Sequence, residues 1–295
     1  MSVGTSVNRA QYSVMSSLED FMTRVDAGKT SIIGYEESDD YLTVNKKNSW
    51  NSFLRLKQEE YQLTIIIPIY NEEESLYRLE KELEVFLKEC VVSAKILMIN
   101  DGSNDNSQAI IEEICNRQKN FHFIEFGQNC GLSVAIKAGF DHADTEWIGY
   151  IDADLQTSPQ DFNVLLQHRN DYDLVTGVRI DRKDSFLKNV SSFIANRIRR
   201  TFTNDGMDDT GCPLKIIRTA VAKRIPMFHG LHRFLPAMVL LQQGKIIQVP
   251  VRHFPRIAGQ SKFGLWNRLI SPLMDCFAYL WMKKRYIHYR VKSVK

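Results

Sequence analysis

The feature that most constrains the fold is an alternation of two hydrophobic periods between residue 61 and about residue 215. Short apolar runs predict β-strands at LTIIIPI (63–69), KILMIN (95–100), FHFIEF (121–126), WIGYI (147–151) and DLVTG (173–177). Helical patterns lie between them at Ser75–Glu89, Asn106–Gln118, Gly131–His142 and Pro159–Arg169. Because these strands are apolar on both faces, they predict an α/β fold whose mostly parallel sheet carries helices on both faces.

A polar loop follows each of the first four predicted strands. The loops are PIYNEEES (68–75), NDGSNDNS (100–107), GQNCGLSVA (127–135) and DADLQTSP (152–159). Ligands of open parallel sheets bind at the carboxyl ends of the strands. Four polar loops at one edge of one sheet therefore predict a ligand site there more strongly than any single loop would.

Asp152 and Asp154 follow the fourth strand, although neighbouring carboxylates repel each other and are costly to bury without a partner. A divalent cation such as Mg²⁺ or Mn²⁺ would reconcile them, because it prefers oxygen ligands and D-x-D on an extended segment points both carboxylates the same way. Gln156 continues the alternation and could add a neutral oxygen. The alternative is that the aspartates cap the helix beginning at Pro159; the three companion loops favour the metal.

The second and third loops have both ligand-binding and structural interpretations. Asp101 can accept hydrogen bonds from a base or ribose, whereas Asp105 or Asn106 can cap the following helix. Gly131 stands at a helix start, where backbone N–H groups could meet a phosphate. A turn is the alternative explanation of this lone glycine.

The first loop, PIYNE, places Pro68, Tyr70 and Glu72 where the first strand ends. An aromatic ring and a carboxylate at that position could hold a nucleoside. Taken alone, the same residues are equally explained by a turn that terminates the strand.

Composition excludes several classes of protein. The net charge of +3 is too small to argue for a nucleic-acid partner. The five cysteines show no C-x-x-C spacing, so they suggest neither a disulfide framework nor a zinc site, and we expect a reducing compartment. The start of the sequence lacks the apolar core of a signal peptide, and no apolar run approaches the roughly 20 residues that span a bilayer.

Six motifs in this order resemble the inverting glycosyltransferases of family two, which have the GT-A fold. They are IIIPIYNEEES, INDGSNDNS, QNCGLSVAIKAGF, IDADLQTSPQD, DDTGCPLKIIR and PVRHFPRIAGQSKFG. The resemblance covers about Tyr61 to Tyr279 and is strongest to the dolichol-phosphate mannosyltransferase-like, polyprenyl-phosphate branch. Asn100 departs from the aspartate that many members have, and the sequence shows no multi-span membrane region of the kind many relatives carry.

The resemblance implies a role for each motif. Residues lining the nucleoside would be Pro68, Tyr70, Glu72, Asp101 and Ser103. Asp152 would lie beside the diphosphate and the metal, and Asp154 and Gln156 would bind the metal directly. Residues closing over the diphosphate would be Arg256, Ser261 and Lys262. An ordinary solvated basic turn is the alternative for this last loop.

Charge then suggests a mechanism. The metal, Arg256 and Lys262 would stabilise the charge that builds on the leaving nucleoside diphosphate. A lipid phosphate acceptor is already an anion and needs cations rather than a strong base; the candidates are Arg179, Lys188 and Arg197. Asp209 could orient those cations or the sugar. A solvated helix face explains Arg197 equally well.

The C-terminal region has an amphipathic pattern. One helical face would carry Leu265, Leu269, Leu273, Cys276, Phe277 and Leu280, with Trp266 and Trp281 beside it. We expect Pro272 to divide the region into two short helices. Trp and Leu with a basic tail suit helices lying on an anionic membrane surface; a packing helix with a soluble tail is the alternative.

We therefore expect an arm at 1–60, a GT-A catalytic domain at 61–262, and membrane-surface helices with a basic tail at 263–295. The expected activity is metal-dependent transfer of a sugar from a UDP- or GDP-sugar to a polyprenyl phosphate. The expected location is the cytoplasmic face of a membrane, with a possible membrane subunit as partner. One alternative is an enzyme acting on a glycan or lipid-linked saccharide hydroxyl, with Asp209 or Asp152 as base. The other is a catalytically silent nucleotide-sugar-binding scaffold.

Overall fold

The computed structural model describes residues 61–180, 200–255, 265–287 and 293, and the side chains of its last helix from Met274 onward. The chain divides into two units, Met1–Gln58 and Glu59–Lys295, and all described residues belong to the second. The predicted N-terminal arm and the predicted boundary at 262 lie outside the described residues.

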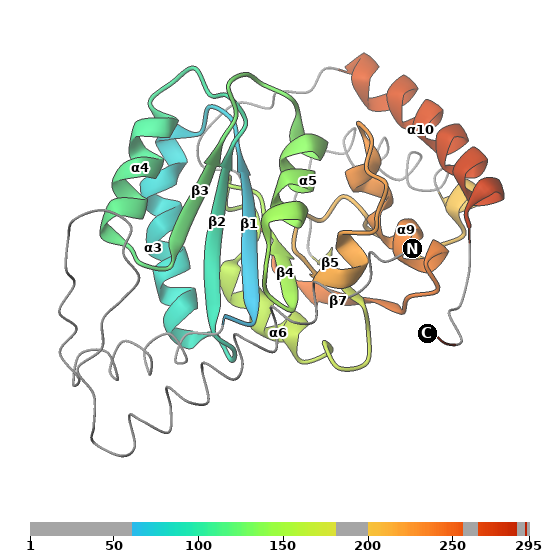
Figure 1. Cartoon of the computed structure of the whole chain (residues 1–295), viewed down its shortest axis with the longest axis horizontal. Helices are drawn as coiled ribbons and strands as arrows, with labels where there is room; N and C mark the ends of the chain where they lie inside the picture. The colour runs from blue at the N-terminus through green and yellow to red at the C-terminus, as the bar shows by residue number, and fades with distance from the viewer. Residues whose placement is uncertain (1–60, 181–199, 256–264, 288–292, 294–295) are drawn as a thin grey trace, which may run out of the picture. The chain divides into compact units, whose positions relative to one another are not determined.

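A mixed sheet of seven strands forms the centre of the described unit (Figure 1). In chain order the strands are β1 (Leu63–Ile69), β2 (Ala94–Asn100), β3 (Phe121–Glu125), β4 (Trp147–Tyr150), β5 (Leu174–Arg179), β6 (Lys215–Arg218) and β7 (Ile246–Val251). Their order across the sheet is β3-β2-β1-β4-β6-β5-β7. Only β6 runs antiparallel to its neighbours β4 and β5, so the predicted mostly parallel sheet is confirmed.

Helices cover both faces of this sheet (Figure 1). One hydrophobic cluster is built with α3 (Glu73–Glu89), α4 (Ser107–Arg117) and α6 (Phe162–Leu166). The other is built with α5 (Leu132–His142), α8 (Thr219–Ala222), α9 (Leu235–Leu241) and α10 (Leu265–Arg285). The α/β class with two helical layers, as predicted, follows from strands that are apolar on both sides.

Strand β1 shows how the sequence produces these layers. Ile65 and Ile67 point into the α3 cluster, whereas Ile66 points into the α5 cluster, as the two-residue period of a strand requires. A Cβ on Gly139 of α5 would lie 2.8 Å from Ile66 Cγ2. Only glycine lets α5 approach the central strand this closely.

The structure differs from the prediction at one helix and two strands. The helix expected at Pro159–Arg169 is a 3-10 turn at Pro159–Asp161 followed by the short helix α6. Strands β6 and β7 were not predicted. The four residues of β6 lead directly into α8, and pairing with β4 and β5 places them in the sheet; β7 is placed there by parallel pairing with β5.

The C-terminal helix also differs from prediction. α10 is one helix of 21 residues that continues through Pro272. An interior proline removes one helical hydrogen bond and clashes with the carbonyl four residues before it; packing of the second half of the helix on the core offsets this cost. Cys276, expected on the outward face, is buried with Tyr279, while Phe277 is 53% exposed and Trp281 67% exposed. Among the described helices, none is long and apolar enough to cross a membrane.

Candidate active site

The carboxylate pair lies at the carboxyl end of β4, the middle strand of the sheet. Asp152, Asp154 and Gln156 are half-buried, whereas Ala153 and Leu155 between them are buried. Leu155 has φ 54°, a left-handed backbone that is rare for a branched side chain. The segment is therefore not extended throughout as predicted, and the Gln156 N–H folds back to donate to Asp154 Oδ1 at 3.1 Å.

The two aspartates do not cap the following helix. The turn beginning at Pro159 has Ser158 as its N-cap residue and no side-chain capping hydrogen bond. The structural alternative for Asp152 and Asp154 is thus removed. Their placement requires another explanation.

The electrostatics of Asp152 are those of a carboxylate shielded from water beside a second carboxylate. Burial, followed by the neighbouring charge of Asp154, raises the pKa of Asp152 to about 6. A hydrogen bond from Tyr150, 2.7 Å from its hydroxyl to Asp152 Oδ1, opposes the rise, as do the charges of Lys215 and Arg179. A cation between the two carboxylates would relieve the same repulsion.

The carboxylate oxygens of Asp152 and Asp154 suit a hard divalent cation that takes only some of its ligands from the protein. The described residues hold no group of three or more His, Cys, Asp or Glu side chains that could bind a metal. Two carboxylates are nevertheless the usual protein contribution to a Mg²⁺ or Mn²⁺ ion that substrate phosphates and water complete. Asp152 and Asp154 would hold such an ion, and the ion would neutralise charge on a diphosphate.

Asp101 organises the third loop from the end of β2. Its carboxylate accepts from Cys130 N at 2.7 Å, Gly131 N at 2.9 Å and Asn129 Nδ2 at 3.0 Å. The Gly131 N–H predicted to meet a phosphate therefore donates to Asp101 instead, because a buried carboxylate competes for the same donors. Close loop approach also explains Gly102: its φ is 64°, and a Cβ there would lie 2.2 Å from the Gln128 carbonyl carbon.

The first and second loops are joined by hydrogen bonds. Ser103 Oγ accepts from Asn71 N at 3.0 Å, and Ser107 Oγ accepts from Glu72 N at 3.0 Å. Asp105 rather than Asn106 binds the first N–H of α4, from Ser107 at 3.0 Å. The predicted nucleoside residues Pro68, Tyr70 and Glu72 lie at the end of β1, and all three are half-buried.

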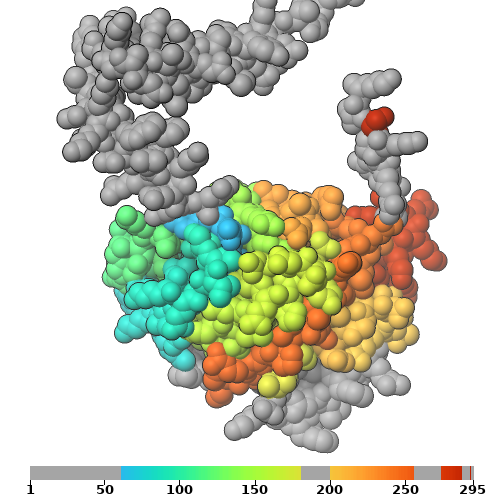
Figure 2. Space-filling model, turned by 90° about the horizontal axis from the view of Figure 1, so that it is seen from below, coloured from blue at the N-terminus to red at the C-terminus, as the bar shows by residue number. Residues whose placement is uncertain are grey.

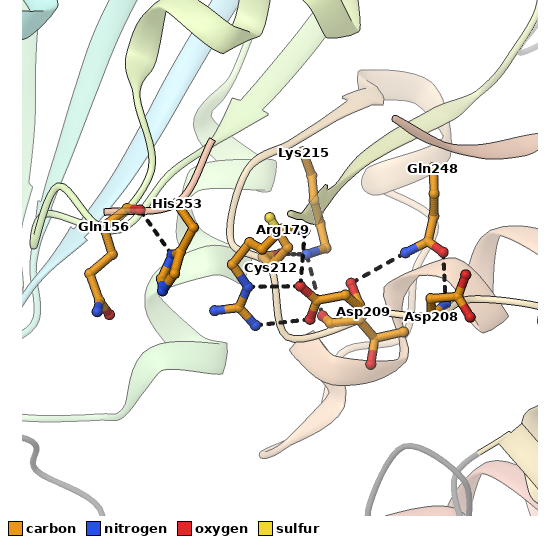
Figure 3. Close-up of polar contacts among 9 residues, drawn as sticks. Gln156, Arg179, Asp208, Asp209, Cys212, Lys215, Gln248 and His253 are labelled. Carbon is orange, nitrogen blue, oxygen red and sulfur yellow. Dashed lines mark hydrogen bonds and ion pairs between the residues drawn. The ribbon is translucent and has the colours of Figure 1, made fainter. Parts of the chain in front are cut away.

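Beyond the acid pair lies a second charged group, shown in Figure 3. Arg179 ends β5, and Asp209 accepts from its Nε at 2.7 Å and its Nη2 at 2.8 Å. The two side chains are only 13% and 8% exposed. The structure therefore brings together two predicted residues, Arg179 and Asp209, as one ion pair.

Lys215 lies behind this pair and was not predicted as a site residue. Its ammonium donates to the backbone carbonyls of Thr210 and Cys212, and burial lowers its pKa. It therefore holds the loop that carries Asp209 (Figure 3). A lysine directly before two isoleucines that occupy the sheet, Ile216 and Ile217, was the available signal in the sequence.

The end of β7 is fastened to the loop that carries the acid pair. Arg252 binds Asp161 through its backbone N at 2.9 Å, its Nε at 2.9 Å and its Nη2 at 2.6 Å. The Gln156 carbonyl accepts from Phe254 N at 2.9 Å and contacts His253 Nδ1 at 3.1 Å. Figure 2 shows a face on which the yellow-green surface between residues 150 and 180 adjoins the orange surface near β7.

Other predicted residues lie outside the described part of the chain. They are Lys188, Arg197, Arg256, Ser261 and Lys262. Their predicted roles stay predictions.

The fold resembles solved glycosyltransferases. Glucosyl-3-phosphoglycerate synthase from Mycobacterium tuberculosis, in complex with Mn²⁺, uridine diphosphate and glucosyl-3-phosphoglycerate, is 12% identical with a TM-score of 0.59; the match covers 78% of this chain and 82% of that one. A mannosyltransferase from Pyrobaculum calidifontis, in complex with GDP-Man and Mn²⁺, is 16% identical with a TM-score of 0.54; the match covers 79% of this chain and 70% of that one. At such identity these structures establish the fold.

The family follows from the sequence itself. The family described as Glycosyl transferase family 2 matches residues 64–226, which is more than half of the 295 residues. The matched span contains the loops after β1 to β4, the Asp152–Asp154 pair and the Arg179–Asp209 ion pair. The chain belongs to glycosyl transferase family 2.

Proposed function

We propose that this glycosyltransferase uses a divalent cation, Mg²⁺ or Mn²⁺, to transfer one sugar with inversion from a nucleoside-diphosphate donor to a polyprenyl phosphate. The observation that carries the proposal is the position of Asp152 and Asp154 at the end of β4, with Lys215 and Arg179 close enough to lower the pKa of Asp152. The acidic side chains suit the cation, and the Arg179 guanidinium beside them suits a second, phosphate-bearing substrate. Lys215 is buried and donates to backbone carbonyls, so it supports the loop rather than the substrate.

The donor would lie over the loops after β1, β2 and β4. Tyr70 and Glu72 stand at the end of β1, and Asp154 stands beyond β4, its neighbour in the sheet. A nucleoside at β1 would thus bring its diphosphate towards the acid pair. The mycobacterial and archaeal relatives of this fold were solved with Mn²⁺ and either UDP or GDP-Man, which supports a donor of this class.

The state of Asp209 favours a phosphate acceptor over a hydroxyl. A hydroxyl acceptor needs a general base, and Asp209 was one candidate. Both Asp209 oxygens accept from the Arg179 guanidinium, so this carboxylate is engaged in the ion pair rather than placed to take a proton from an acceptor hydroxyl. The other candidate, Asp152, would be occupied beside the metal. A phosphate acceptor needs neither base, because it is already an anion.

Helix α10 supports a membrane location on the cytoplasmic side. Its exposed apolar residues include Met274, Phe277 and Trp281, and its last turn carries Lys283, Lys284 and Arg285. Apolar side chains beside a basic cluster are the pattern of a helix that lies on an anionic lipid surface. A polyprenyl phosphate would be presented at that same surface, and a membrane subunit could add to the anchoring.

The direct test is turnover of a panel of UDP- and GDP-sugars with Mn²⁺, with and without a short-chain polyprenyl phosphate. A glycosylated lipid product that requires both Mn²⁺ and the lipid phosphate would support the proposal and identify the donor. The matched control is the Asp154→Asn variant under the same conditions. Donor binding with no lipid product, but with transfer to a hydroxyl acceptor, would contradict the phosphate-acceptor assignment. Donor binding with neither transfer to any acceptor nor hydrolysis of the donor would favour a silent nucleotide-sugar-binding scaffold.

A further inference from the structure

Tyr150 is a buried tyrosine whose hydroxyl meets the carboxylate pair. It is the last residue of β4, is 5% exposed and donates to Asp152 Oδ1 at 2.7 Å. Side chains two positions apart on a strand share a face, so Tyr-x-Asp at the strand end places this hydroxyl beside that carboxylate.

The tyrosine ring is held in place by its surroundings. It belongs to the hydrophobic cluster on the α5 face, and its backbone pairs with Lys215 of β6 in the antiparallel ladder. Lys215 is the first residue of β6, and its ammonium donates to the carbonyls of Thr210 and Cys212 in the loop just before that strand. A ring fixed by packing and by strand pairing presents its hydroxyl in one direction only.

A hydrogen bond from such a donor restricts the carboxylate that accepts it. The bond to Asp152 is charge-assisted and short, and it engages one oxygen, Oδ1. The second oxygen of the same carboxylate then has a defined direction. In metal sites, groups that hydrogen-bond to ligand side chains orient those ligands and commonly change metal affinity 10- to 100-fold.

We propose that Tyr150 is a positioning residue for the divalent cation: by holding Asp152 Oδ1, its hydroxyl turns the other carboxylate oxygen of Asp152 towards a cation bound with the donor diphosphate. This inference rests on the proposed function, because it takes the metal and the nucleotide donor from it. The substitution Tyr150→Phe isolates the hydroxyl, since phenylalanine fills the same space.

The experiment measures Mn²⁺ affinity of the full chain in the presence of UDP or GDP, from the free Mn²⁺ signal in electron paramagnetic resonance. Three proteins are compared: wild type, Tyr150→Phe and Tyr279→Phe. Tyr279 is a matched control because it is also a buried tyrosine, 2% exposed, but lies in α10 outside the candidate site. Its ring stacks on the ring of Phe234, which directly precedes α9. We expect Tyr150→Phe to weaken Mn²⁺ binding about 10-fold and Tyr279→Phe to leave it unchanged.

Two further readouts separate positioning from a general structural effect. Activity of Tyr150→Phe should recover as Mn²⁺ is raised, so that the concentration of Mn²⁺ giving half-maximal rate increases. Adding Tyr150→Phe to an Asp152→Ala protein should have no further effect on Mn²⁺ affinity, because alanine has no oxygen to accept the tyrosine hydrogen bond. Melting curves of all variants establish that each is folded.

The outcomes distinguish this inference from the proposed function. Wild-type Mn²⁺ affinity in a folded Tyr150→Phe protein overturns the role of Tyr150 and leaves the proposed function intact. An equal loss in Tyr279→Phe also overturns it, because the effect would then be general. Absence of Mn²⁺ binding by wild type with either nucleotide overturns both.

Discussion

The Asp209 carboxylate accepts two hydrogen bonds from the Arg179 guanidinium, one on each oxygen, at 2.7 Å from Nε and 2.8 Å from Nη2. It also accepts from the Arg179 backbone N–H at 3.3 Å. These contacts join the end of β5 to the loop before β6. The pair is buried, so the guanidinium can take only a narrow range of directions. Whatever anion Arg179 binds is therefore positioned indirectly by Asp209.

Replacing Asp209 by asparagine should damage both stability and acceptor binding. Breaking a buried ion pair from one side costs about 3 kcal/mol, because the remaining charge loses its partner. We expect the free energy of unfolding to fall by about this amount and KM for the acceptor to rise at least about 10-fold, with little change in KM for the donor. Chemical denaturation and steady-state kinetics with each substrate varied separately provide the measurements.

The neighbouring Asp208 offers the control for this prediction. Its ion pair with Arg200 is exposed, with 70% of the Asp208 side chain accessible. Exposed pairs contribute about 0–1 kcal/mol, so Asp208→Asn should leave stability and both KM values near those of wild type. If Asp208→Asn and Asp209→Asn behaved alike, burial of the Arg179 pair would not be the cause.

Asp154→Asn should abolish metal-dependent turnover while the protein stays folded. Asparagine keeps the size and the hydrogen-bond acceptor for Gln156 N but removes the negative charge that a divalent cation requires. We expect loss of Mn²⁺-dependent sugar transfer by at least about 100-fold, with a circular dichroism spectrum like that of wild type. Asp171, an exposed residue, supplies the control substitution Asp171→Asn. Full activity of Asp154→Asn would eliminate the metal assignment.

His232 should make the protein sensitive to acid. Burial, with smaller effects of Arg233 and Lys215, lowers the pKa of His232 from 6.5 to about 3. Between these two values the unfolded chain binds a proton that the folded chain does not, so stability falls as pH drops from 6.5 towards 3. The slope from this one group is at most about 1.4 kcal/mol per pH unit.

The measurement is the free energy of unfolding from urea titrations at several pH values across that window. His232→Gln removes the titrating group. Its plot of the free energy of unfolding against pH should therefore have a smaller slope than that of wild type, by an amount equivalent to at most one proton. His142, which is exposed, provides the control His142→Gln. Parallel curves for His232→Gln and wild type would show that His232 is not the origin of the acid sensitivity.

Exposed aromatic residues of α10 should govern binding to lipid. Phe277 is 53% exposed and Trp281 67% exposed, one turn apart on the helix and close to the basic last turn. Complete burial of an exposed apolar side chain contributes roughly 1.5–3 kcal/mol, and because both rings are already partly covered, each would contribute about half of this in a headgroup layer. The double variant Phe277→Ser, Trp281→Ser should therefore co-sediment with anionic vesicles at least about 10-fold more weakly than wild type.

Val91 serves as the control because it is 63% exposed but lies between α3 and β2, outside α10 and its basic last turn. Val91→Ser should bind vesicles as wild type does. Neutral phosphatidylcholine vesicles should bind all proteins more weakly, since the attraction to Lys283, Lys284 and Arg285 is then missing. Equal sedimentation of the double variant and wild type would remove α10 from the proposed membrane surface.

Local pattern was sufficient for the α/β class and the edge of the sheet that carries the polar loops. Strands such as LTIIIPI are apolar on both faces, and this is a property of the sequence alone. The position of Asp152 and Asp154 at a strand end follows in the same way, because the carboxyl ends of parallel strands meet at one edge.

Only the tertiary structure decided which groups become hydrogen-bond partners and which side chains pack together. Asp101 accepts the Cys130 and Gly131 N–H groups, and Cys276 of α10 faces the core; neither could be read from a linear pattern. Asp101 lies about thirty positions from its partners, and the rotation of α10 is set by what it packs against. Sequence periodicity determines which residues share a face, whereas hydrogen bonding and packing between distant segments determine what that face meets.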